Sequence, residues 1–113
     1  IVFGTLGTER MRIKENGNVG IGTDNPDVKL HVHSTGSNTT IRAQAPDNYA
    51  AVLSAQGDSQ GTGRLYVGQN NTYGGGIEYN GDNSPASTGA GADYINLYRV
   101  VNGSYFWTAE FLF

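Results

Sequence analysis

Aromatic side chains in the second half of the sequence are the residues most suited to ligand chemistry. Tyr105 and Trp107 alternate in one segment, and Tyr73 and Tyr79 flank three consecutive glycines. Such rings can stack on the C–H faces of sugars while their polar groups hydrogen-bond hydroxyls. Tyr73 and Tyr79 also adjoin glycine-rich loops, where binding residues concentrate. All four are therefore candidate ligand-binding residues. The alternative is that these aromatic residues form a core or chain–chain interface, the interpretation favoured for Phe106, Phe111 and Phe113.

An acidic and amide-rich stretch, Asn80-Gly-Asp-Asn-Ser84, supplies a second candidate site. The side chains of Asp82 and Asn83 could hydrogen-bond sugar hydroxyls or hold calcium. The spacing is not that of an EF-hand, and the local oxygen atoms are too few for calcium coordination. Asp82 and Asn83 are therefore candidate sugar ligands, with a plain turn as the alternative.

His31 and His33 alternate along one expected strand and would share a face. Imidazole is a common ligand of transition metals, so a metal site at His31 and His33 is conceivable. The apolar residues Val28, Leu30 and Val32 alternate with them and place both histidines on the opposite, solvent-facing side. We therefore expect surface histidines, with the metal site as the weaker alternative, and no cofactor.

The sequence lacks the motifs of common enzyme classes. It has no cysteine, which excludes thiol catalysis, Cys-based zinc sites and disulfides. Gly20-Ile-Gly22 is not followed by a helix or a Gly-Lys-Ser/Thr sequence, so it is not a nucleotide-binding loop. No Gly-x-Ser-x-Gly nucleophile elbow is present, and no motif pairs any of the ten carboxylates. We expect a protein that is not an enzyme.

Strands must position these residues, because the patterns favour an all-β fold and no helix. Asn16-Gly17 favours a type I′ hairpin turn, Asn102-Gly103 marks a second hairpin, and Asn70–Gly76 reads as a loop. Eight to ten short strands at this spacing are typical of a sandwich, barrel or other all-β form. The expected strands are Glu9–Lys14, Asn18–Gly22, Asp27–His33, Thr39–Ala45, Tyr49–Ala55, Arg64–Gln69, Ile77–Tyr79, Asp93–Val101 and Ser104–Phe113.

The composition indicates a chain that is short of core. Val, Ile, Leu and Phe make up 24 of 113 residues, whereas Gly, Asn, Ser and Thr make up 45. A chain of this kind is expected to share a core with other copies. The net charge of −3 argues against a nucleic-acid partner. No apolar stretch is long enough for membrane insertion as a helix. The alternating pattern gives way to a cluster of small and polar residues after His33, which suggests two modules, 1–33 and 34–113.

One stretch resembles a known element. Gly17-Asn-Val-Gly-Ile-Gly-Thr, followed by Asn25-Pro26 and Lys29-Leu-His-Val32, lies within residues 7–32, about a quarter of the chain. It is similar to the shaft-to-tip segment of bacteriophage tail-fibre-like proteins, which often end in a self-cleaving peptidase S74 chaperone. Similar segments occur in trimeric adhesive fibres of predatory bacteria. Residues 74–99 resemble the tip domains of such fibres more weakly.

The resemblance implies an intertwined homotrimeric fibre, with a short β shaft over 1–33 and a small β-sandwich-like tip over 34–113. It implies an extracellular place, on a virion tail fibre or a bacterial surface. The expected function is non-catalytic attachment to a target-cell surface glycan or another envelope polymer. One alternative is a structural spacer or trimerisation domain. A second is a tip that depolymerises capsule or lipopolysaccharide.

Overall fold

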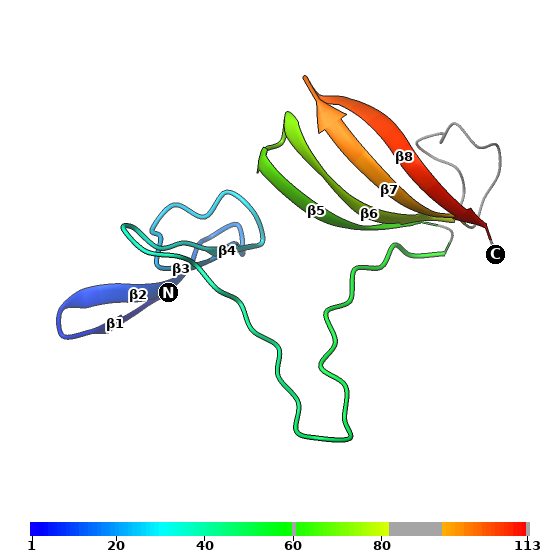
Figure 1. Ribbon diagram of the computed structural model, residues 1–113. Helices are drawn as coiled ribbons and strands as arrows, with labels where there is room; N and C mark the ends of the chain where they lie inside the picture. The colour runs from blue at the N-terminus through cyan, green and yellow to red at the C-terminus, as the bar shows by residue number, and fades with distance from the viewer. Residues whose placement is uncertain (60, 82–93, 113) are drawn as a thin grey trace. The chain divides into compact units, whose positions relative to one another are not determined.

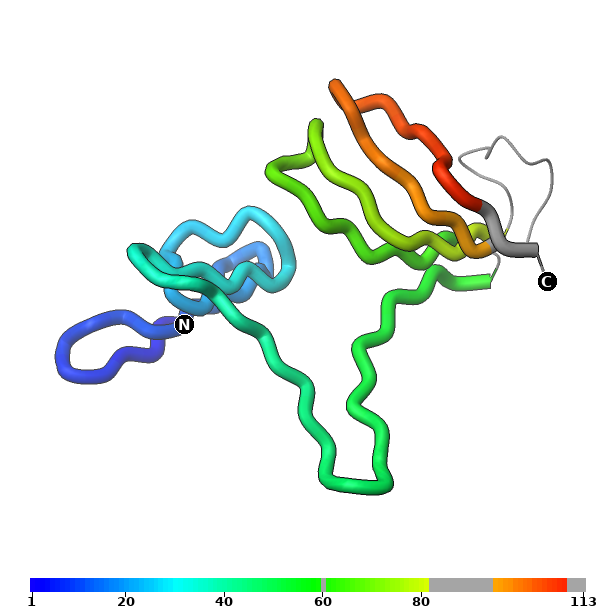
Figure 2. Tube along the Cα trace, viewed as in Figure 1, coloured from blue at the N-terminus to red at the C-terminus, as the bar shows by residue number. Residues whose placement is uncertain are grey.

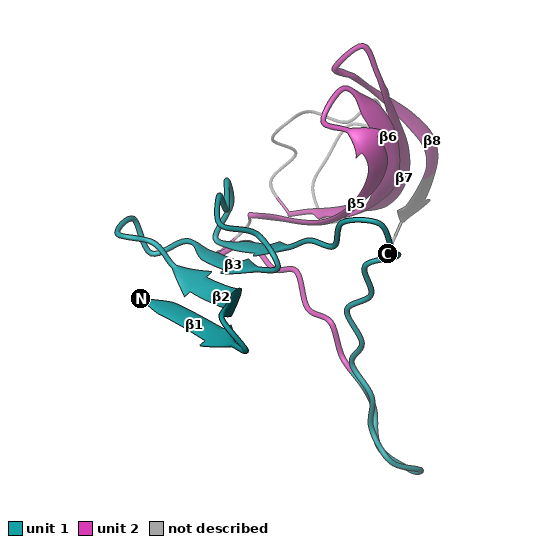
Figure 3. Cartoon of the chain, turned by 90° about the vertical axis from the view of Figure 1, so that its left-hand side faces the viewer, with its two compact units in different colours: residues 1–51 teal, residues 52–113 magenta. Residues whose placement is uncertain are grey.

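The structure is a computed structural model that describes residues 1–59, 61–81 and 94–112. Eight strands form two four-stranded sheets (Figure 1), which confirms the all-β expectation. No helix in these residues is long and apolar enough to cross a membrane. The chain divides into two compact units, residues 1–51 and 52–113 (Figure 3).

The first unit contains one sheet in the order β1-β2-β3-β4. β1–β2 and β2–β3 are antiparallel, and β3–β4 is parallel. The structure adds β1, for which the sequence pattern gave no expectation. β4 is shorter than the expected strand over Asp27–His33. The bounds are β1 (Val2–Thr5), β2 (Thr8–Ile13), β3 (Val19–Ile21) and β4 (Leu30–Val32).

Two glycines let the chain fold closely onto β3. A Cβ at Gly20 would lie 2.4 Å from the carbonyl oxygen of Thr23, and one at Gly22 would lie 2.1 Å from that of His33. Such a strand, bare on one side, lets another backbone approach. Here the approaching backbone is the chain's own, from the residues just after β3 and just after β4.

The hairpin turns differ in how well the sequence predicts them. Asn102 and Gly103 both have positive φ, at 52° and 75°, so this turn is type I′. The type I′ prediction for Asn16-Gly17 is wrong, because Gly17 is at φ 79° but Asn16 is not at positive φ. Instead the Gly17 N–H donates to the Lys14 carbonyl at 2.9 Å, which closes a longer turn ending in a left-handed glycine.

Residues 33–59 contain no strand, so the predicted strands Thr39–Ala45 and Tyr49–Ala55 are wrong. Figure 2 shows much of this part of the chain as an extended loop. Its large side chains, among them Ile41, Tyr49 and Leu53, are exposed. The segment has a strand-like pattern, but within the described chain it pairs with no sheet, and its large apolar side chains remain exposed.

The second unit contains one antiparallel sheet in the order β5-β6-β7-β8. Its strands are long and curved (Figure 1). The described residues of this unit form a single layer, so they supply only one of the two sheets that a sandwich needs. The bounds are β5 (Thr62–Asn70), β6 (Tyr73–Asn80), β7 (Tyr94–Val101) and β8 (Ser104–Leu112).

The three consecutive glycines belong to β6, so the predicted loop over Asn70–Gly76 is wrong at its second half. A Cβ at Gly75 would lie 2.3 Å from the Tyr98 carbonyl oxygen, and one at Gly76 would lie 1.8 Å from that of Leu65. The glycines therefore allow close backbone packing between β6 and both of its neighbours.

An irregularity in β8 changes which residues share a face. Leu97 pairs with Ala109, but the next residue, Tyr98, pairs with Trp107, so Thr108 is an extra residue in β8. The Thr108 hydroxyl donates to the Leu97 carbonyl at 2.9 Å. Alternation from Trp107 to Phe111 is interrupted by this bulge. An uninterrupted alternation would place Tyr105, Trp107, Phe111 and Phe113 on one face. The bulge breaks this expectation at Phe111, which pairs with Ile95, and Phe113 lies outside the described residues.

The two sides of the second sheet differ in character. One side, here the Arg64 face, carries the buried residues of this unit. The other, here the apolar face, carries mostly exposed aliphatic and aromatic side chains. The Arg64 face comprises Arg64, Tyr66, Glu78, Asn80, Asn96, Tyr98, Val100, Tyr105 and Trp107. The apolar face comprises Leu65, Val67, Tyr73, Ile77, Tyr79, Ile95, Leu97, Arg99 and Phe106.

Candidate functional site

The register of the second sheet aligns three polar residues across its centre. Arg64 on β5 pairs with Glu78 on β6, which pairs with Asn96 on β7. Directly opposed residues have Cβ atoms about 4.5–5.5 Å apart, so their side chains meet. These three residues form the polar centre of the Arg64 face.

Arg64 forms an ion pair with a fully buried carboxylate. Its Nε donates to Glu78 Oε2 at 2.7 Å, and its Nη2 also donates to that oxygen. Its Nη1 donates to the Tyr105 hydroxyl at 3.2 Å. Glu78 is 0% exposed. Burial opposes the charge on Arg64, but the hydrogen bonds and attraction of Glu78 outweigh it and raise the guanidinium pKa.

Three aromatic rings stand next to this pair. Tyr98 stacks on Tyr105 with ring centres 5.6 Å apart, and Trp107 meets the Tyr98 ring edge-on at 6.0 Å. The Arg64 guanidinium lies 4.9 Å from the centre of the Tyr105 ring and 5.3 Å from that of Tyr98. Both distances suit cation–π attraction. Burial raises the pKa of the Tyr98 phenol. Together these rings form an aromatic cluster around an ion pair, in which Arg64 balances the charge of Glu78.

Tyr66 occupies the neighbouring part of the same face, where the sheet is bare. Its ring lies over Gly68 and Gly74, since a Cβ at either position would collide with it. Its hydroxyl donates to the Asn70 carbonyl. A hollow of about 230 Å³ opens here, lined by Arg64, Tyr66, Asn71 and Tyr105.

Several buried polar atoms on the Arg64 face have no hydrogen-bond partner in the described part of the chain. They are Glu78 Oε1, both polar atoms of the Asn96 amide and the Tyr98 hydroxyl. Native proteins pair the large majority of such atoms. Leaving a buried donor or acceptor unpaired costs about 1–3 kcal/mol. Four such unpaired atoms lie on the Arg64 face. They mark this face as a site whose polar groups lack hydrogen-bond partners within the described chain.

The structure separates the candidate residues proposed from the sequence. Tyr105 and Trp107 lie together on the Arg64 face, with ring centres 6.1 Å apart. Tyr73 and Tyr79 lie at opposite ends of β6 on the apolar face. The Tyr73 hydroxyl donates to the Asn102 side chain, and Tyr79 lines a hollow of about 260 Å³ with Leu65 and Ile77. Asp82 and Asn83 lie outside the described residues.

The two histidines sit at the end of the first sheet. His31 is on β4, and its Nδ1 lies 3.0 Å from the Asp27 carboxylate. His33 is exposed, and the two rings meet edge-on at 6.0 Å. Over the described ranges, no group of three or more His, Asp or Glu side chains could hold a metal ion.

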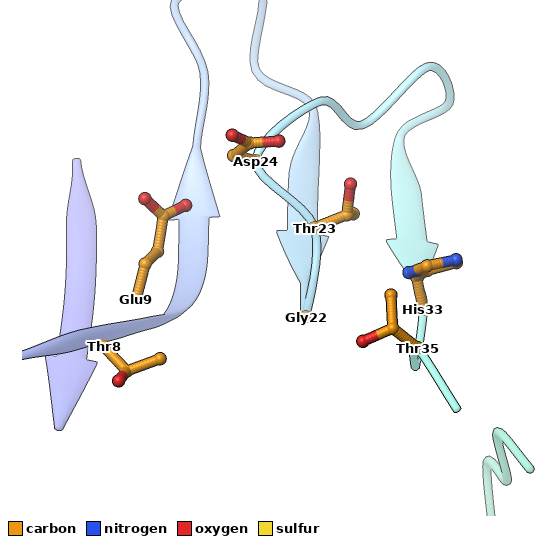
Figure 4. A pocket seen from close by; sticks show the side chains of 7 residues that line it. All are labelled: Thr8, Glu9, Gly22, Thr23, Asp24, His33 and Thr35. Carbon is orange, nitrogen blue, oxygen red and sulfur yellow. The ribbon is translucent and has the colours of Figure 1, made fainter. Parts of the chain in front are cut away.

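A second polar hollow, of about 400 Å³, lies in the first unit (Figure 4). Thr8 and Glu9 line one side of it, Thr23 and Asp24 reach in from the segment after β3, and His33 and Thr35 lie on the other side. The Arg12 guanidinium holds both oxygens of Glu9, at 2.7 and 2.6 Å, and these hydrogen bonds lower the pKa of Glu9. None of the atoms that line this hollow is a buried polar atom without a partner in the described chain. The Arg64 face is therefore the stronger candidate.

Sequence reasoning missed four residues that define the site, namely Arg64, Glu78, Asn96 and Tyr98. A signal was present in the alternation of β5, β6 and β7. Polar or aromatic residues alternate there with Leu65, Ile77 and Leu97. Usual patterning turns the aliphatic residues inward. In this unit the polar side is the buried one.

Comparison with known proteins adds no relative. No family model, no curated protein and no solved structure matches the chain.

Proposed function

We propose that this chain is the receptor-binding part of an extracellular homotrimeric fibre of the phage tail-fibre-like kind. It attaches the fibre, on a virion or a bacterial surface, to a glycan or another envelope polymer of a target cell, without catalysis. The resemblance of residues 7–32 to a fibre shaft supports the assembly. The observation that carries the binding role is the cluster of Tyr98, Tyr105 and Trp107 around the Arg64–Glu78 pair.

This cluster has the two features that sugar recognition needs. Tyr105 is 44% exposed and offers a ring to a sugar face. Arg64 uses three of its five N–H groups on Glu78 and Tyr105, which leaves N–H groups for a ligand. Asn71 adds an amide at the edge of the same hollow. Three copies of one weak site would give strong attachment through avidity.

Attachment to target cells tests this function through two aromatic variants. Trp107→Ala and Tyr105→Ala should each reduce attachment at least tenfold and leave the assembly unchanged, because they remove the stacking surface. Tyr73→Ala is the matched control, since Tyr73 is a tyrosine of similar exposure on the apolar face. Loss of attachment in Tyr73→Ala alone would contradict the proposed site.

A structural role as a spacer or trimerisation domain is the second candidate, and the apolar face favours it. Leu65 and Val67 are 59% and 68% exposed, and Ile77 and Phe106 are also exposed. Patches of this kind mark interaction surfaces. β5 and β8 are also edge strands that could pair with other chains. For this role, Trp107→Ala would leave attachment intact, whereas charged substitutions at Leu65 or Ile77 would dissociate the trimer.

The depolymerase alternative has less support. Glu78 is a buried carboxylate held by Arg64, an environment unlike that of a catalytic acid that must exchange protons with substrate. Incubation with capsule or lipopolysaccharide should therefore leave polymer length unchanged.

A further inference from the structure

The unpaired polar atoms of the Arg64 face lie close together. Asn96 pairs directly with Glu78, and Tyr98 follows Asn96 by two residues on the same side of β7. Glu78 and Asn96 are 0% exposed and Tyr98 is 4% exposed. The unpaired atoms are Glu78 Oε1, Asn96 Oδ1, Asn96 Nδ2 and the Tyr98 hydroxyl.

These atoms require a partner that both donates and accepts hydrogen bonds. Glu78 Oε1 and Asn96 Oδ1 only accept, Asn96 Nδ2 only donates, and the Tyr98 hydroxyl can do either. A hydroxyl group does both. Two adjacent hydroxyls, as on a sugar ring, could satisfy this mixture with a single ligand.

The electrostatics of the site favour an uncharged partner. Arg64 already neutralises the Glu78 carboxylate. An added ligand charge would therefore be buried without a counter-charge, which is strongly unfavourable. Aromatic rings on the same face, Tyr98 and Trp107, offer apolar surface to the C–H groups of a sugar.

Arg64 connects a surface hollow to these polar atoms. It lines the hollow that also includes Tyr66, Asn71 and Tyr105, and it contacts the buried Glu78 on its other side. Rotation of the exposed Tyr105 side chain, with Arg64 still paired to Glu78, would connect the hollow to the polar atoms. Rotamer changes of exposed side chains occur within nanoseconds.

We infer that Glu78, Asn96 and Tyr98 form a subsite for one neutral, hydroxyl-bearing sugar residue, entered through the hollow beside Arg64 and Tyr105. This assignment rests on the proposed attachment function and narrows its ligand class to uncharged sugars. Sugars with a carboxylate, such as uronic acids, are disfavoured.

Immobilised hexosides paired with their uronic acids provide the test on the full chain. The pairs are galactose with galacturonate, glucose with glucuronate and mannose with mannuronate, presented at equal density. At least one neutral hexoside should bind ten times more strongly than its acid. Asn96→Leu, which is nearly isosteric, should bind it at least tenfold more weakly and yet melt at an equal or higher temperature, because two unpaired buried atoms are removed.

Tyr98→Phe removes a single oxygen atom. It tests the proposed subsite independently if Asn96→Leu does not fold. It should weaken hexoside binding severalfold without lowering the melting temperature, and Tyr73→Phe should change neither. Unchanged binding in Tyr98→Phe, or a preference for the uronic acids, overturns the subsite and leaves the attachment function standing. Absence of binding to any sugar or envelope polymer overturns the attachment function itself.

Discussion

At the scale of single residues, the Arg64–Glu78 pair places a fully buried carboxylate at the centre of the site. Arg64→Met leaves the fully buried Glu78 carboxylate without its counter-charge. We expect a loss of about 3 kcal/mol in the free energy of unfolding, measured with urea, because a buried charge without a partner is costly. The double variant Arg64→Met/Glu78→Leu should recover most of this loss. A cost below about 1 kcal/mol for Arg64→Met would mean that the pair behaves like an exposed one.

Tyr98 should make stability sensitive to alkaline pH. Burial raises its pKa in the folded state above the ordinary tyrosine value of about 10. The folded chain therefore holds this proton more tightly than the unfolded chain. The resulting stabilisation is complete below pH ~10 and is lost as pH rises through the raised pKa.

Urea unfolding at pH 8 and at higher pH values measures this effect. Tyr98→Phe should reduce the alkaline loss of stability, and Tyr49→Phe, at an exposed tyrosine, should leave it unchanged. Equal alkaline loss in all three proteins would contradict the assignment.

Leu6 is a strained residue in the first hairpin. Its φ is 51°, in the left-handed region, and its side chain is 100% exposed. Left-handed backbone costs a residue with a Cβ about 1–2 kcal/mol, and Asn tolerates it better. Leu6→Asn should therefore raise the stability of the first unit by about 1 kcal/mol. Gly7→Ala, at φ 72°, should lower it. Destabilisation by Leu6→Asn would indicate that Leu6 packs against another chain in the assembly.

At the scale of strands, the glycines of β6 determine how the second sheet is built. A Cβ at Gly76 would lie 1.8 Å from the Leu65 carbonyl oxygen, so Gly76→Ala forces β5 away from β6. We expect a loss of about 3 kcal/mol in thermal or urea unfolding, at the upper end for overpacking. Gln69→Ala, at an exposed position of β5, should cost less than about 0.5 kcal/mol. Comparable effects of the two variants would contradict the close packing.

Local alternating patterns predicted most strands of the two sheets, although β1 gave no such signal. β2, β5 and β7 follow their alternating patterns, β8 does so as far as Trp107, and Asn102-Gly103 joins β7 and β8 in the predicted hairpin. The pattern failed over Thr39–Ala45 and Tyr49–Ala55 because a strand needs a partner as well as a pattern. It also failed at Gly74–Gly76, where a strand without side chains looks like a loop.

The site was only partly predictable for a related reason. Trp107 and Tyr105 were chosen for their chemistry, and the sheet brings them together. Tyr73 and Tyr79 were chosen on the same grounds but lie on the apolar face. Register decides which residues meet, and a bulge at Thr108 that no local signal announces sets the register of β8. Glu78 and Asn96 acquire their importance from burial, which the usual alternation would give to the aliphatic side of these strands.

At the scale of the whole molecule, apolar side chains are distributed in an unusual way. Among the described residues, Tyr98 and Val100 are the buried hydrophobic side chains, whereas many large ones are exposed in both units. Burial of apolar surface is the main favourable term in folding, and the described part of the chain has little core of its own. Assembly of several copies would cover the apolar face and the extended segment over 33–59.

The native mass of the purified chain, measured by light scattering, tests the proposed trimeric fibre most directly. The trimeric account predicts three times the 12.0 kDa of one chain, unchanged by dilution through the micromolar range. A folded monomer at 12.0 kDa would contradict it. The exposed apolar face would then belong to a chain that is stable alone, and the fibre assignment would lose its physical basis.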